Sequence, residues 1–102
     1  MIFRRSRFAE IVDTQLEMFV HDRRDLIEDV QQRLAAYNRA DRAEAEELYG
    51  DYVDAVDVAA DALAAMRDSY ARTLDEPDEY ARAFNRAAGR RLPEYARELE
   101  SR

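Results

Sequence analysis

Four aspartates recur at steps of three, three and four in the segment DYVDAVDVAAD, at Asp51, Asp54, Asp57 and Asp61. Carboxylates at this spacing lie along one side of an α-helix, and several carboxylates together can hold a hard cation such as Ca²⁺. A metal site needs ligands that converge, however, and a stripe on the outside of a helix does not converge. We interpret the stripe as a solvated face, with a docking face for a basic partner or a metal site as alternatives. Its members are Asp54, Asp57, Asp61 and Asp68.

The only histidine, His21, lies four residues from both Glu17 and Asp25, which places the three side chains on one flank of a helix. Imidazole and carboxylates together bind transition metals. Di-iron bundles, however, use an inward-facing Glu-x-x-His motif, and this chain lacks that motif. We expect His21 to be exposed and in contact with the two acids. The alternative is a metal ligand at a contact between subunits.

Arg23 interrupts an apolar helical face, with Phe19 before it and Ile27 after it. An unpaired buried charge is costly, so the guanidinium should pair with a carboxylate, stack on a tyrosine, or extend to the rim of the face. The register of the hairpin predicted below places it near Tyr52. We interpret Arg23 as a structural tie, within the chain or between subunits. The alternative is an anion-binding arginine in a cavity lined by tyrosines.

A basic stripe follows near the end of the chain, where Arg82, Arg86 and Arg90 are spaced by four residues. Nucleic-acid binding is one interpretation of such a stripe, but the formal net charge of −7 argues against it. Residues 41–76 carry eleven acids and only three arginines, and so hold the whole imbalance. We therefore favour pairing of the basic stripe with the acidic face, in the same chain or a neighbouring one. The two stripes together form the candidate interaction surface.

Hydrophobic spacing predicts that a few long helices position these residues. Only two glycines and two prolines occur among the 102 residues, so turn signals are rare. The pattern predicts a single all-α domain over residues 1–102. Its helices are expected over about 5–37 and 41–74, which pair as a long antiparallel hairpin, and over about 77–90 and 93–100. The second helix carries an apolar seam with heptad spacing, made of Ala45, Tyr49, Tyr52, Val56, Ala59, Leu63, Met66 and Tyr70.

The apolar face of that second helix is wider than one partner helix covers, because Leu48, Val53, Ala60 and Ala62 flank the seam. The usual solution is a second hairpin. We therefore predict a homodimer that forms a four-helix bundle. The alternative is that the two C-terminal helices fold back and cover the face within one chain.

Several kinds of chemistry find no support in the sequence. The chain has no cysteine, no glycine-rich phosphate loop, and no base near Ser6, Ser69 or Ser101. We expect no enzymatic activity and no cofactor. No segment approaches the roughly 20 apolar residues of a membrane span, and no signal peptide is apparent, so we expect a cytoplasmic protein without a membrane partner. Sixteen arginines and no lysine indicate a GC-rich bacterial genome.

These patterns favour a non-enzymatic, homo-oligomeric interaction module. Its expected partner is a second copy of itself, or an unidentified protein, and not nucleic acid. The alternative function is a helical bundle that binds a metal through His21 and neighbouring acids, or a small anion through Arg23 and tyrosines.

Overall fold

The computed structural model describes residues 7–102, which form five α-helices and no strand. The prediction of an all-α fold is confirmed. Ser6 and the expected start of the first helix near residue 5 lie outside the described residues. The elements are α1 (Ala9–Asp22), α2 (Arg24–Asn38), α3 (Ala45–Ala71), α4 (Pro77–Arg91) and α5 (Pro93–Glu100).

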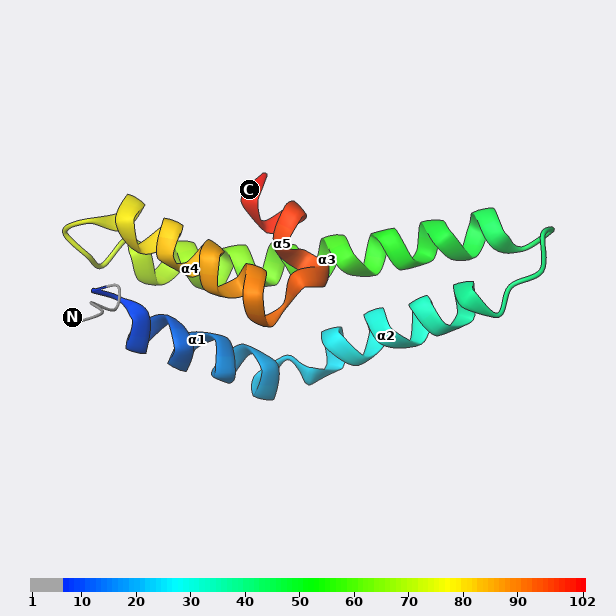
Figure 1. Cartoon of the computed structure of the whole chain (residues 1–102), viewed down its shortest axis with the longest axis horizontal. Coiled ribbons are helices and arrows are strands. Elements are labelled where there is room, and N and C mark those ends of the chain that lie inside the picture. The colour runs from blue at the N-terminus through cyan, green and yellow to red at the C-terminus, as the bar shows by residue number, and fades with distance from the viewer. Residues whose placement is uncertain (1–6) are drawn as a thin grey trace, which may run out of the picture.

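The two long sides of the molecule run antiparallel. α1 and α2 follow one another along one side, and α3 returns along the other (Figure 1). Both helices that follow α3 begin with a proline, α4 with Pro77 and α5 with Pro93. Proline suits this position because the first N–H of a helix has no partner within the helix. The result is elongated, with extents of 54 × 32 × 23 Å.

The prediction of one continuous helix over about 5–37 is wrong at Arg23, where the backbone leaves helical geometry (φ −115°, ψ 36°). The Arg23 N–H donates to the Phe19 carbonyl at 2.8 Å and closes α1, while the Arg23 carbonyl accepts from Leu26 and Ile27 and opens α2. An unbroken helix would carry the guanidinium into the apolar face. Burying that charge costs more than interrupting the helix at an exposed turn, so the chain breaks and Arg23 stays in solvent.

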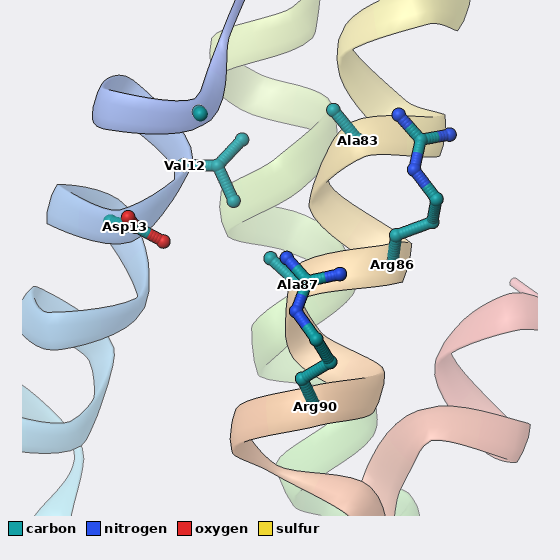
Figure 2. A pocket seen from close by; sticks show the side chains of 7 residues that line it. Val12, Asp13, Ala83, Arg86, Ala87 and Arg90 are labelled. Atoms are coloured by element: carbon teal, nitrogen blue, oxygen red, sulfur yellow. The ribbon is translucent and has the colours of Figure 1, made fainter. Parts of the chain in front are cut away.

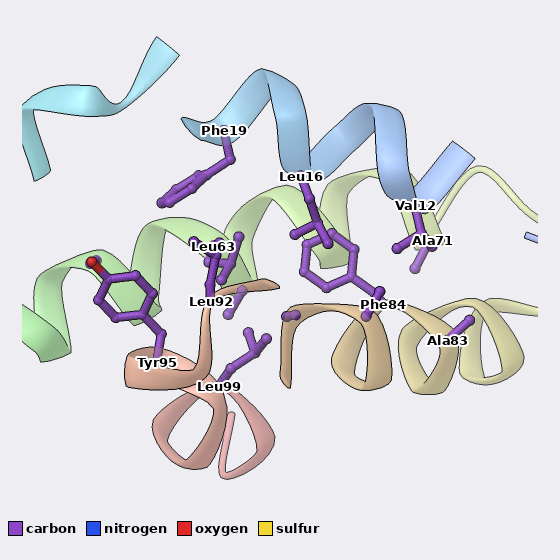
Figure 3. Packing of buried hydrophobic residues seen from close by; sticks show 14 of the residues in the cluster. Val12, Leu16, Phe19, Leu63, Ala71, Ala83, Phe84, Leu92, Tyr95 and Leu99 are labelled. Atoms are coloured by element: carbon purple, nitrogen blue, oxygen red, sulfur yellow. The ribbon is translucent and has the colours of Figure 1, made fainter. Parts of the chain in front are cut away.

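The core lies where α4 and α5 fold back onto α1 and α3. Side chains from α1 meet side chains from α4 and α5 across the C-terminal half of α3 (Figure 3). α1 packs on α4, and α2 packs mainly on α3. The alternative in which the C-terminal helices cover the apolar face within one chain is therefore observed over this half of α3. The largest fully buried side chains are Tyr80, Tyr95, Phe19, Phe84, Leu16, Leu63, Leu99, Val12 and Val30.

The chain thus has two parts, a body and an arm. The body consists of α1, α4, α5 and the C-terminal half of α3. The arm, residues 24–58, consists of α2, the connecting loop and the N-terminal half of α3. It lies beyond α4, and α5 borders its inner end (Figure 1). Among the described residues, no helix is both long enough and apolar enough to cross a membrane.

Candidate functional site

One face of α3 is buried where the helix belongs to the body and exposed where it belongs to the arm. Tyr49, Val53, Val56, Ala60 and Leu63 follow steps of four and three along this face. Leu63 and Ala60 are fully buried and Val56 is 7% exposed, whereas Val53 is 37% and Tyr49 50% exposed. The exposed members continue the stripe that α4 and α5 bury further along the same helix. We call Tyr49, Tyr52, Val53 and Val56 the arm face.

The arm face forms one wall of a cleft of about 180 Å³, and Glu94, Arg97 and Glu98 of α5 stand on the other side. Tyr49 also stacks at a tilt between two other tyrosines, with ring centroids 5.2 Å from Tyr37 and 6.2 Å from Tyr52. An apolar, aromatic centre with a charged rim is the usual anatomy of a protein–protein interface. Tyrosine is common there because its ring is apolar and its hydroxyl tolerates water.

Arg23 does not reach this face. Its Nε lies 3.3 Å from Asp25 Oδ1, and 45% of its side chain is exposed. The hydrogen bond from Arg23 lowers the pKa of the Asp25 carboxyl. The predicted position in the apolar face near Tyr52 is wrong, because the helix ends at this residue. Arg23 pairs with a carboxylate, which was one of the expected outcomes, but the pair is exposed and local.

The acidic face of α3 is partly neutralised within the chain, by arginines other than those predicted. Arg102 lies 3.4 Å from Asp57 and 2.5 Å from Asp61. The pKa of Arg102 is raised, first by its hydrogen bond to Asp61. Asp54 is exposed and lines a shallow groove in which Arg33 bridges to Asp29 at 3.3 Å and Asp51 at 3.8 Å.

The basic stripe of α4 lies elsewhere. Within residues 7–102 none of its three arginines forms an ion pair with the acidic face, so the predicted pairing inside one chain is wrong. Arg86 and Arg90 instead line a groove between α1 and α4, opposite Asp13 (Figure 2). Arg82 lies one turn away, beside Asn85 and Glu100.

His21 is exposed as predicted, with 83% of its side chain accessible, but its contacts differ from the prediction. Its Nδ1 lies 2.9 Å from Asp22. Glu17 lies 3.8 Å from Arg91, and Asp25 binds Arg23, so the expected contacts of His21 with these two acids are wrong. In the part of the chain that the structure describes, no three His, Cys, Asp or Glu side chains are placed to share a metal ion.

The sequence analysis missed Arg67, which is 4% exposed. Its Nη1 donates to Asn85 Oδ1 at 3.0 Å and to the Leu99 carbonyl at 3.1 Å, and its Nε donates to Asp68 Oδ1 at 2.8 Å. The guanidinium therefore joins α3 to α4 and α5. A signal was present, because Arg67 lies four residues after Leu63 and four before Ala71, in the apolar stripe of α3.

Comparison with known proteins assigns no family. No protein-family model, curated protein or solved structure matches the chain. A function therefore has to be inferred from the residues and their arrangement.

Proposed function

We propose that this chain is a non-enzymatic helical module that self-associates, and that a second copy covers its arm face. One observation carries the proposal: the stripe of α3 that α4 and α5 bury on the body continues, uncovered, through Val53 and Tyr49 on the arm. Removing this apolar surface from water favours association. A two-fold dimer uses the same face on both copies, so each residue contributes twice.

A two-fold axis across the arm face places the two arms antiparallel. The loop between α2 and α3 carries two exposed arginines, Arg39 and Arg42, and also two acids, so it has no net charge. The opposite border of the arm face carries Glu94, Arg97 and Glu98 of α5. Both borders thus mix charges of both signs, and the arrangement rests on the two-fold symmetry of the arm face. A two-fold axis near Tyr49 brings the loop of one copy to α5 of the other. Four helices then surround the two arm faces, as in a four-helix bundle.

Light scattering tests the proposal directly. At micromolar concentration we expect a mass about twice the 11.9 kDa of one chain. Tyr49→Glu and Val53→Glu should each give a monomer, because a buried unpaired carboxylate costs several kcal/mol. Val58→Glu is the matched control, since Val58 is 53% exposed but lines the groove with Asp29 and Arg33 instead. A monomeric wild type, or equal dissociation of all three variants, would overturn the proposal.

A further inference from the structure

The groove between α1 and α4 has the dimensions of a small-ligand site. Its volume is about 340 Å³, at the lower end of the roughly 300–1,000 Å³ of such sites. Small side chains on both helices leave this space open. Arg91 donates to the Asp13 carbonyl at 3.2 Å and links α4 to α1. The groove is lined by Ala9, Val12, Asp13, Ala83, Arg86, Ala87 and Arg90.

Two guanidinium groups stand at the rim of this groove. Arg86 and Arg90 are one helical turn apart on α4, so both side chains lie on the same flank (Figure 2). Neither makes a hydrogen bond or an ion pair with any residue from 7 to 102, although the chain has 23 acids and 16 arginines. Other surface arginines, such as Arg39 and Arg42, also lack an ion pair with any described residue. Arg86 and Arg90 differ from those arginines because they border the same groove, which has an apolar floor.

The chemistry of the groove selects its ligand. A guanidinium presents N–H donors in a planar fork that matches the oxygens of a phosphate or carboxylate. The floor, formed by Val12, Ala83 and Ala87, is apolar and offers nothing to a second charged group. The groove therefore suits a small molecule with one anionic end and one apolar end.

We propose that this groove binds a small oxyanion, phosphate or carboxylate, attached to an apolar body, with Arg86 and Arg90 holding the oxygens. The proposed site lies on α4 and does not involve Arg23, which was the alternative anion site in the sequence. Because the groove is formed by α1 and α4 of one chain, this proposal stands independently of self-association through the arm.

A titration followed by amide NMR of the full chain tests it, with phenyl phosphate, benzoate, inorganic phosphate and chloride at matched ionic strength. We expect saturable shifts in residues 9–13 and 83–90 with phenyl phosphate or benzoate, and weaker binding of inorganic phosphate, which lacks an apolar body. The stronger of the two aromatic anions identifies which oxyanion the groove prefers. Shifts that do not saturate, or that chloride reproduces, would overturn the proposal.

Two double variants distinguish binding in the groove from a non-specific effect of surface charge. Arg86→Gln with Arg90→Gln should weaken binding about tenfold or more, since each loses a charged hydrogen bond. Arg72→Gln with Arg82→Gln removes the same charge outside the groove and should leave the affinity unchanged. Equal weakening in both pairs would show a non-specific charge effect and refute the site. Amide spectra of each variant without ligand confirm that the fold is retained.

Discussion

At the scale of single residues, two buried tyrosines carry an unusual cost. Tyr80 and Tyr95 are fully buried, and within the described part of the chain their hydroxyl groups have no hydrogen-bond partner. Tyr80 packs among Phe8, Tyr70 and Phe84. Burial raises the pKa of both phenols to about 12. The rings therefore stabilise the core, whereas their hydroxyls oppose folding.

Tyr80→Phe and Tyr95→Phe should leave the free energy of unfolding unchanged or raise it, because each removes a buried hydroxyl whose isolation costs about 1–3 kcal/mol. Because burial raises the pKa of these phenols, ionisation costs no stability below the unfolded pKa of about 10, and stability falls as the pH rises from there to about 12. The double variant should therefore lose less stability between pH 10 and 12. Urea unfolding at several pH values measures both effects, with Tyr37→Phe as a half-buried control. A loss above about 1 kcal/mol at pH 7 would show that the hydroxyls have partners.

The sequence pattern indicated that an arginine within an apolar stripe is important, but it pointed to Arg23 and not to the buried Arg67. Arg23 and Arg67 both occupy positions where helical spacing predicts an apolar residue, but only Arg23 was identified. Spacing alone cannot distinguish the two outcomes. Arg23 lies at a point where the helix can break into solvent, whereas Arg67 lies where Asn85 and the Leu99 carbonyl supply acceptors. Those acceptors come from other helices, so only the tertiary fold reveals them.

At the scale of helices, most boundaries followed from local signals. The helix predicted over about 41–74 is observed as Ala45–Ala71, and that over about 77–90 as Pro77–Arg91. Proline, early acids and hydrophobic periodicity all act within a few residues. The break at Arg23 carries no glycine or proline, so it depends on which face the rest of the chain buries. The positions of α4 and α5 on α3 depend on long-range packing in the same way.

Arg67→Met tests how the three C-terminal helices are held together. The change removes donors from Asn85 Oδ1 and from the Leu99 carbonyl, which lies in the last turn of α5. A buried acceptor without a donor, such as the Leu99 carbonyl, costs about 1–3 kcal/mol, so we expect a loss of that size in urea unfolding. Arg67→Lys should recover only part of it, because one ammonium group cannot reproduce the fork of donors. Arg23→Met, at an exposed pair, should change stability by no more than about 0.5 kcal/mol. Similar losses at both positions would contradict the assigned roles.

At the scale of the whole molecule, stability should be uneven. The body packs α1, α4 and α5 around α3, whereas the arm consists of two helices that pack mainly on one another. Regions with few buried contacts open locally more often than a packed core. The stability of the arm should therefore depend most on binding of a partner. The stability of the groove between α1 and α4, which belongs to the body, should depend on it least.

Hydrogen exchange at two protein concentrations connects this unevenness with self-association. At low concentration, amides of α2 and residues 45–58 should exchange faster than those of residues 59–67 in the body. Association that covers only the arm stabilises it by about 2.7 kcal/mol when the free partner is at about 100 times Kd. Raising the concentration about a hundredfold from Kd should therefore slow exchange on the arm and leave α1 and α4 unchanged. In Val53→Glu the arm should stay fast at both concentrations, whereas Val58→Glu should behave like the wild type. Concentration-dependent protection of α1 or α4 without protection of the arm would place the interface on the body, and the arm face would then lose its role.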